Sequence, residues 1–233
     1  ASDLYGVEYW SAGHFQVSAD GLVQVRAGFG GEPATVNLLD IVRGLQERGL
    51  PMPVLLRIEN LLDAQIAQLN QSFARAIAQS GYRGSYRGVF PIKVNQQSQI
   101  IDEVASFGAR FGHGLEAGSK AELLIALASL DVDQGYIVCN GYKDEEFINL
   151  GLMAQKLGYR IFFVVETPAE LPLLIQCAQQ AGVRPRLGAR VKLSSQVSGH
   201  WNATSGDRSI FGLTSMQLID LVDELKAHAM QIG

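Results

Sequence analysis

The feature that most constrains the fold is a repeated alternation, from residue 85 onward, of short apolar runs with helix-length amphipathic stretches. Repeated strand–helix units imply a parallel sheet covered by helices, because each parallel crossover needs a dozen or more residues. The apolar runs predict strands over residues 86–95, 110–118, 135–141, 160–167 and 186–193. The spacing of apolar residues between and after them predicts helices over residues 98–107, 119–130, 144–157, 168–181 and 213–229.

Two parallel architectures fit this alternation, a doubly wound sheet and a (β/α)8 barrel. No G-x-G-x-x-G motif follows a first strand and no G-x-x-x-x-G-K-[ST] motif occurs, so neither nucleotide-binding fold is supported. About five strand–helix units are visible, fewer than the eight of a complete barrel. The chain is therefore either not a barrel or a barrel that stops partway.

Residues 1–52 lack this alternation and predict a separate N-terminal β-hairpin and helix. Residues 1 to about 35 indicate β structure, because alternating apolar residues flank Asp20-Gly21, a dipeptide typical of hairpin turns. The apolar spacing over residues 37–48 predicts a short amphipathic helix, which Gly49 ends.

Residues 53–233 are expected to form the strand–helix region. This region opens with PVLLRI at residues 53–58, an apolar run that predicts a strand. Residues 59–80 carry apolar side chains at spacings of three and four, which makes them the clearest helix of the sequence. A domain boundary is therefore expected between residues 52 and 53.

Composition excludes several classes of function. Hydrophobic residues make up 47% of the chain and charged residues 18%, which indicates a folded globular protein. The net charge of −4 argues against a general nucleic-acid binder, and no apolar run is long enough to span a membrane. The two cysteines, Cys139 and Cys177, suit neither a disulfide framework nor a metal site. A reducing compartment follows, so we expect a cytoplasmic protein.

Lys93 is the sharpest candidate for chemistry. It interrupts the apolar run VFPIKVN, and lysine is rarely buried because its ammonium group loses hydration. Side chains at the carboxyl ends of parallel strands line the active site of such folds. Desolvation there would favour the neutral amine, which attacks carbonyl groups to form a Schiff base. The alternative is a lysine whose stem packs while its head group reaches solvent.

Several motifs resemble one known family. VFPIKVNQQ is similar to the aromatic-x-x-Lys-x-Asn signature of fold-type III pyridoxal-phosphate enzymes, and GLEAGSKAEL resembles the block that follows it. The chain is identified as a member of the ornithine, diaminopimelate and arginine decarboxylase family, most similar to the bacterial and plant biosynthetic arginine decarboxylases. The further stretches that carry this resemblance are YGVEYWSAGHFQV, VCNGYKDEEFI, PRLGARVKL and SGHWNATSGDRSIFGL.

The resemblance implies a partial (β/α)8 barrel of the alanine-racemase type in which Lys93 holds pyridoxal 5'-phosphate. It also implies cofactor-binding roles for Glu116, near the lysine, and for Arg190, which reaches the site from the fifth strand. The alternative for Glu116 is a solvated carboxylate before a helix N-terminus. An arginine in an apolar strand needs a partner, so a Glu116–Arg190 contact is expected. Lys192, on the same face of that strand, is a weaker candidate.

The same resemblance implies an activity: decarboxylation of L-arginine to agmatine and carbon dioxide, in polyamine biosynthesis. It implies pyridoxal phosphate as the cofactor, suggests Mg²⁺ as a second one, and implies a homo-oligomer, dimer or tetramer. Chains of this family are longer, so we expect an N-terminal fragment that is inactive alone, with residues 1–52 packing against a C-terminal β domain in the full protein. Two readings stay open, a catalytically silent homologue acting as a binding or assembly partner and an aldolase-type Schiff-base lysine.

Other residues that could carry chemistry receive structural interpretations. His113 and His200 have no second ligand at metal spacing, so we predict no metal site and take both as structural or surface residues. Cys139 is expected to be a small core residue. Ile210 stands where the family usually has a lysine, which weakens any charge role there but preserves the packing of the Phe-Gly pair that follows.

Overall fold

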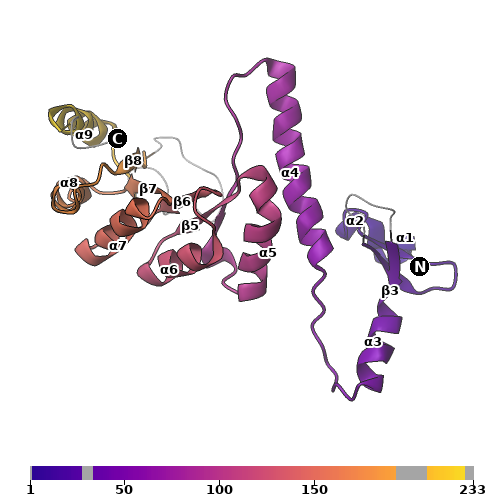
Figure 1. Ribbon diagram of the computed structural model, residues 1–233. Coiled ribbons are helices and arrows are strands. Elements are labelled where there is room, and N and C mark those ends of the chain that lie inside the picture. Colours follow the sequence, from indigo (N-terminus) through magenta and orange to yellow (C-terminus); the bar gives the residue numbers. More distant parts are fainter. Residues whose placement is uncertain (1, 28–33, 193–208, 229–233) are drawn as a thin grey trace. The chain divides into compact units, whose positions relative to one another are not determined.

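The computed structural model describes residues 2–27, 34–192 and 209–228 (Figure 1). These fall into two units, residues 1–84 and residues 85–233, and each is described by itself. The boundary expected after residue 52 stays a prediction.

The first unit contains a three-stranded antiparallel sheet in the order β1–β2–β3. β1 (Phe15–Val17) and β2 (Val23–Ala27) form the predicted hairpin, with Val17 opposite Val23. β3 (Ala34–Asn37) pairs with β2 and leads directly into the predicted helix, α3 (Leu38–Glu47).

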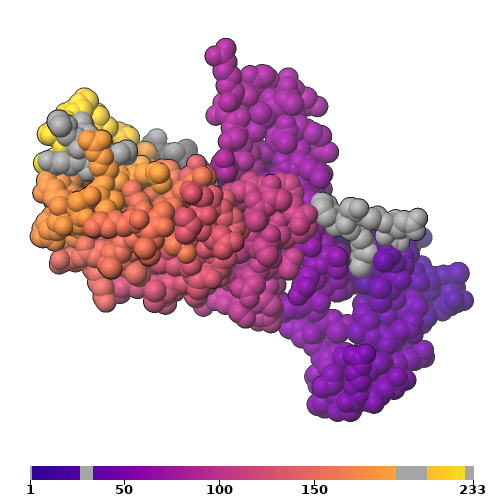
Figure 2. Space-filling view, viewed as in Figure 1, coloured from indigo at the N-terminus to yellow at the C-terminus, as the bar shows by residue number. Residues whose placement is uncertain are grey.

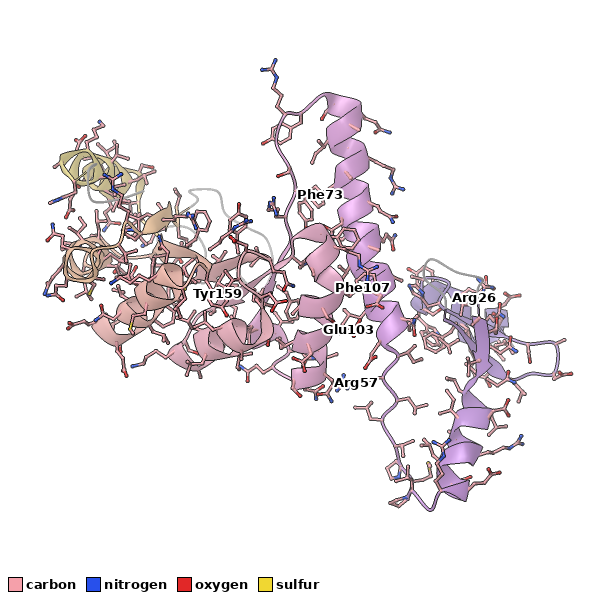
Figure 3. All side chains as sticks on the ribbon, viewed as in Figure 1. Arg26, Arg57, Phe73, Glu103, Phe107 and Tyr159 are labelled. Carbon is pink, nitrogen blue, oxygen red and sulfur yellow. The ribbon has the colours of Figure 1, made fainter. Side chains whose placement is uncertain are left out.

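Hydrogen bonds between side chains link the strands of this small sheet, in addition to the backbone hydrogen bonds. Arg26, labelled in Figure 3, donates from Nε to Oε1 of Gln16 on the neighbouring strand at 2.8 Å. Gln16 in turn donates to Gln24 at 2.9 Å. These links reinforce a sheet whose three strands are individually too short to be stable.

Two predictions for this unit were wrong. The first ten residues are not β structure: α1 (Ser2–Tyr5) and α2 (Val7–Trp10) precede the sheet. Residues 53–58 form no strand, although the clear helix that follows them, α4 (Glu59–Ser80), is present. An apolar run becomes a strand only when another strand pairs with it, and the two prolines at residues 51 and 53 lack the N–H donors that pairing requires.

The second unit contains a five-stranded parallel sheet in the order β4–β5–β6–β7–β8. Strands that follow one another in sequence are neighbours in the sheet, which is the order of a (β/α)8 barrel and not of a doubly wound sheet. The chain therefore forms part of a barrel. The strands are β4 (Val89–Pro91), β5 (Gly114–Ala117), β6 (Tyr136–Cys139), β7 (Arg160–Val165) and β8 (Arg186–Ala189).

A helix follows each strand, as predicted. Figure 1 shows α5 to α8 following one another along one side of the sheet, and in Figure 2 the magenta to orange residues of this unit form a continuous surface. The helices are α5 (Ser98–Gly108), α6 (Lys120–Ser129), α7 (Glu145–Lys156), α8 (Glu170–Ala181) and α9 (Ser215–Ala227); the short turns η1 (Ile92–Val94) and η2 (Ala109–Phe111) flank α5.

The core lies between the sheet and these helices. Leu115, Ile137 and Phe163 of the strands are fully buried, as are Leu152 and Leu174 of the helices. Polar groups also link these elements: the hydroxyl of Tyr159, just before β7 and labelled in Figure 3, donates to the carbonyl of Leu127 in α6 at 3.1 Å. Across residues 2–27, 34–192 and 209–228, no helix combines the length and apolar character needed to cross a membrane.

Polar caps start the helices immediately after the strands end. Ser119 accepts the Glu122 N–H at 3.3 Å, while the Glu122 carboxylate accepts the N–H of Gly118 at 2.7 Å. Asp144 accepts the Phe147 N–H at 2.8 Å and caps α7 in the same way. Short capped connections keep the carboxyl ends of the strands close to the helix N-termini.

His113 lies at the other end of the sheet, just before β5. It is buried, and a Cβ added at Gly88 or Gly108 would come within 3 Å of its side chain, so two glycines make room for it. Burial lowers the pKa of His113. Of the two expected interpretations, the structural one holds; His200 lies outside the described residues.

Candidate functional site

A polar side chain stands at the carboxyl end of each of the five parallel strands. Because parallel strands all end at one edge of their sheet, these side chains gather along that edge, where α/β folds place their ligands. In strand order they are Lys93 after β4, Glu116 in β5, Asn140 after β6, Glu166 after β7 and Arg190 after β8.

The first three of these residues form a hydrogen-bonded group. The Lys93 Nζ lies 3.4 Å from Oε1 of Glu116, and Asn140 donates from Nδ2 to the same oxygen at 3.1 Å. Glu116 is 6% exposed, and its other oxygen, Oε2, is buried without a hydrogen-bond partner among the described residues. A carboxylate oxygen left in this way costs roughly 1–3 kcal/mol. Glu116 Oε2 therefore has hydrogen-bonding capacity that the described residues do not use.

Lys93 itself is not buried within a strand, contrary to the prediction. β4 ends at Pro91, which has no N–H to continue the ladder, and the chain turns into η1. Ile92 then packs inward, fully buried, while the side chain of Lys93 is 63% exposed. The expected position at the end of the strand is confirmed. The amine faces solvent, with one buried carboxylate beside it.

Glu166 and Arg190 form a second group at the other end of the row. Arg190 Nη1 lies 3.3 Å from each carboxylate oxygen of Glu166, and the Gly141 N–H donates to Glu166 Oε1 at 2.9 Å. Glu166 is 1% exposed, whereas Arg190 is 51% exposed. The guanidinium carbon also lies 5.3 Å from the centre of the Phe211 ring. Arg190 is thus held by a buried carboxylate and by an aromatic ring.

The expected Glu116–Arg190 contact was wrong, because the partner of Arg190 is Glu166. β8 is next to β7, which carries Glu166, and three strands away from β5, which carries Glu116. Since neighbouring strands lie about 4.8 Å apart, three strand spacings along the sheet amount to roughly 14 Å. Each cation therefore pairs with the carboxylate of an adjacent strand.

Asn140 and Glu166 were not singled out from the sequence. Both come immediately after an apolar strand, which is the signal that drew attention to Lys93. Applying that rule to every strand end would have found them. Lys192, the weaker candidate, lies two residues past Arg190, where its N–H donates to the carbonyl of Leu213 at 2.8 Å.

The segment before α9 packs against the same edge. The rings of Phe211 and Tyr142 lie 5.0 Å apart, the Tyr142 hydroxyl donates to the carbonyl of Ile210, and the Gly212 N–H donates to the carbonyl of Glu166. The expected Phe-Gly packing is therefore present. Cys139, fully buried in β6, is the expected core residue, and burial raises the pKa of its thiol to about 12.

The groups at this edge fit pyridoxal phosphate, the cofactor that the resemblance implies. Lys93 offers an exposed primary amine to an aldehyde carbon, Glu116 offers a buried oxygen without a partner, and Arg190 offers a half-exposed cation. In the described parts of the chain, no group of three His, Cys, Asp or Glu residues could hold a metal ion. The suggestion of Mg²⁺ stays a prediction.

Comparison with protein families and curated proteins gives concordant matches. Residues 63–233 match the family model of the pyridoxal-binding domain of pyridoxal-dependent decarboxylases. The biosynthetic arginine decarboxylase of Gloeobacter violaceus is 44% identical over 229 residues, covering 97% of this chain and 35% of the relative. That of Rhodopirellula baltica is 45% identical over 231 residues, covering 99% of this chain and 34% of the relative. The chain thus spans about a third of the length of these relatives.

Solved structures agree with the sequence matches. The biosynthetic arginine decarboxylase of Campylobacter jejuni superposes with a TM-score of 0.83 at 34% identity, covering 98% of this chain and 36% of that chain. Diaminopimelate decarboxylase from M. jannaschi gives a TM-score of 0.62 at 21% identity, covering 93% of this chain and 46% of that chain. The second likeness shows the fold alone.

Proposed function

Because the chain belongs to the pyridoxal-dependent decarboxylases, through their pyridoxal-binding domain, we propose that it supplies the cofactor-anchoring part of a biosynthetic arginine decarboxylase. The proposed reaction removes the α-carboxylate of L-arginine as carbon dioxide and leaves agmatine, for polyamine synthesis. The observation that carries this proposal is the exposed Lys93 amine beside the buried Glu116 carboxylate, at the carboxyl edge of the parallel sheet.

Pyridoxal phosphate, when bound, supplies an electron sink for the electron pair left behind by the departing carbon dioxide. We propose Lys93 as the residue that holds it covalently. An amine must lose a proton before it attacks a carbonyl carbon, and Glu116 Oε1, 3.4 Å from Nζ, is the group placed to accept that proton. Asn140 fixes this oxygen through its own hydrogen bond. Glu116 therefore orients the amine and accepts its proton.

Arg190 is proposed as a second cofactor-binding residue. Its guanidinium is restrained on one side by Glu166 and approached by the ring of Phe211, which limits the rotamers it can adopt. About half of the side chain remains exposed, and Arg190 follows β8 at the same edge of the sheet as Lys93. A fixed, half-exposed guanidinium suits an anionic group of the cofactor or the substrate.

The anchor is tested by chemical trapping in the full-length protein. The protein is loaded with pyridoxal phosphate, reduced with borohydride, digested and mapped by mass spectrometry. We expect the added mass on Lys93. The Lys93→Ala variant should lack this label, whereas Lys120→Ala, which replaces a lysine at the start of α6 and serves as the control, should keep it. A label on another lysine would overturn the assignment.

The substrate is tested separately. Carbon dioxide released from carboxyl-labelled arginine, ornithine and lysine is compared, and we expect arginine to be preferred. A protein that is labelled at Lys93 but releases no carbon dioxide from any of the three would favour a catalytically silent binding partner instead.

Further proposals rest on the resemblance to longer relatives. We propose a homo-oligomeric, cytoplasmic enzyme in which residues 1–52 pack against a β domain outside this sequence. Light scattering of the full-length protein measures the oligomeric state, and a monomer would contradict the proposal.

A further inference from the structure

A buried ion pair lies next to the row of strand-end residues. The Lys143 Nζ lies 3.2 Å from Glu170 Oε1, and the two side chains are 0% and 6% exposed. Burying two charges is costly unless each is well hydrogen-bonded, and a well-packed apolar pair often serves stability as well or better. Stability alone is therefore a weak explanation for this ion pair.

Glu170 joins the connections that follow two different strands. Its Oε1 accepts both the Nζ and the backbone N–H of Lys143, in the connection after β6, at 3.2 and 3.1 Å. Its Oε2 accepts the backbone N–H groups of Glu166 and Thr167, in the connection after β7, at 2.7 and 3.3 Å. One carboxylate at the start of α8 thus receives four donors from two connections.

The same contacts lead to the candidate site. Glu166, held through its N–H, presents its carboxylate to Arg190 and to the Gly141 N–H. The Nζ of Lys143 donates to the carbonyl of Gly141 at 2.5 Å, so Gly141 is bound through both of its backbone groups. Its φ of +74° suits glycine, and a Cβ there would lie 2.8 Å from the carbonyl oxygen of Gly118. The connection after β6 is therefore held at Gly141 by hydrogen bonds to Glu166 and Lys143 and by close packing against Gly118.

We propose that Lys143 and Glu170 are positioning residues of the cofactor site. Their ion pair ties the connections after β6 and β7 together, fixes the Glu166 carboxylate, and through it fixes the Arg190 guanidinium and the residues Asn140-Gly141. The effect on the cofactor rests on the function proposed above, whereas the effect on the connections does not.

The matched pair of variants is Glu170→Gln and Leu174→Ala, both in α8. Glu170→Gln keeps the size of the side chain but leaves one acceptor oxygen for donors on two sides. Leu174→Ala removes a fully buried side chain of the same helix and weakens packing, while both charged groups of the ion pair stay in place. Glu166→Gln is a third variant, which alters the Arg190 contact directly and leaves the ion pair in place.

The first measurement is amide hydrogen exchange of the full-length protein without cofactor. In Glu170→Gln one of the two acceptor oxygens becomes an amide, so we expect exchange to speed up at least about tenfold either at Lys143 or at Glu166 and Thr167, since a hydrogen bond to a charged group is worth that factor or more. We also expect faster exchange at Gly141, because its acceptor Glu166 is no longer held in place. The exchange rate of the Gly141 amide is the decisive measurement, because Gly141 contacts Glu166 and Lys143 but not Glu170. Unchanged exchange at Gly141 would overturn the proposal.

The second measurement is the Kd for pyridoxal phosphate at a temperature where circular dichroism shows each variant folded. We expect Kd to rise about tenfold in Glu170→Gln and in Glu166→Gln, and less than twofold in Leu174→Ala. Equal increases in Kd in Glu170→Gln and Leu174→Ala would mean that the ion pair acts only through stability, and would overturn its positioning role. If wild-type protein is not labelled at Lys93, the proposed function fails, while exchange at Gly141 still decides the positioning role.

Discussion

The two halves of the candidate site are built from the same parts but are braced differently. Each pairs an exposed cation with a buried carboxylate, Lys93 with Glu116 in one half and Arg190 with Glu166 in the other. In the lysine half, one carboxylate oxygen has no partner among the described residues. In the arginine half, both oxygens are bonded, and a second ion pair stands behind them. The lysine half therefore keeps capacity for a ligand, whereas the arginine half is fixed in advance.

The largest expected difference between the halves is in catalysis. Lys93→Ala removes the proposed covalent anchor and should lower kcat/KM for arginine by roughly 10³-fold or more. Arg190→Ala removes a cation that binds without a covalent bond and should lower it by roughly 10- to 100-fold. Steady-state kinetics of the full-length variants measure both. Equal losses would contradict the division of roles between the halves.

The bracing of the arginine half predicts a large effect on stability. Lys143→Met leaves the buried Glu170 carboxylate without its counter-ion and should lower the free energy of unfolding by about 3–5 kcal/mol. The double variant Lys143→Met/Glu170→Gln removes both charges and should recover part of that loss. Urea unfolding of the four proteins closes the cycle. A double variant that loses the sum of the two single losses would show that the charges are not coupled.

A matched pair of amide substitutions compares the two carboxylates directly. Glu166→Gln leaves Arg190 and the Gly141 N–H competing for one acceptor and should lower the free energy of unfolding by about 1–3 kcal/mol. Glu116→Gln can keep one acceptor toward Lys93 and Asn140 and place its amide where an oxygen had no partner, so stability should change by less than about 1 kcal/mol.

Glu116→Gln should affect the reaction with the cofactor more than it affects stability. Because Glu116→Gln removes the proton acceptor of Lys93, the rate of pyridoxal phosphate incorporation should fall even where stability does not. Stopped-flow absorbance after mixing follows this rate. Unchanged incorporation together with a large loss of stability would exchange the roles assigned to Glu116 and Glu166.

The sequence predicted the strand–helix order of the second unit because period and length carry that information locally. It also placed Lys93 at the carboxyl edge of the sheet, because parallel strands all end there, whereas the positions of Glu116 and Arg190 beside it came from the family resemblance. The pairing of Arg190 with Glu166 could not be derived from spacing alone, because it depends on which strands are neighbours. The strand predicted over residues 53–58 was wrong for a similar reason, because the local sequence pattern does not show whether another strand is available to pair with it.

The smallest expected effect concerns the aromatic residues beside Arg190. Tyr142→Phe loses the hydroxyl hydrogen bond to Ile210 but keeps the ring contact with Phe211, and about half of Tyr142 is exposed. Stability should therefore fall by less than about 1 kcal/mol, and the Kd for pyridoxal phosphate should stay within twofold. Phe211→Leu also removes the ring near the guanidinium, worth about 0.5–1 kcal/mol at an exposed site, and should raise Kd about two- to fivefold.

Both aromatic variants are measured by spectroscopic titration with the cofactor. An effect of Tyr142→Phe as large as that of Phe211→Leu would mean that the segment before α9 is held mainly by the hydroxyl contact. The guanidinium of Arg190 would then be held in place by the Tyr142–Ile210 hydrogen bond as well as by Glu166.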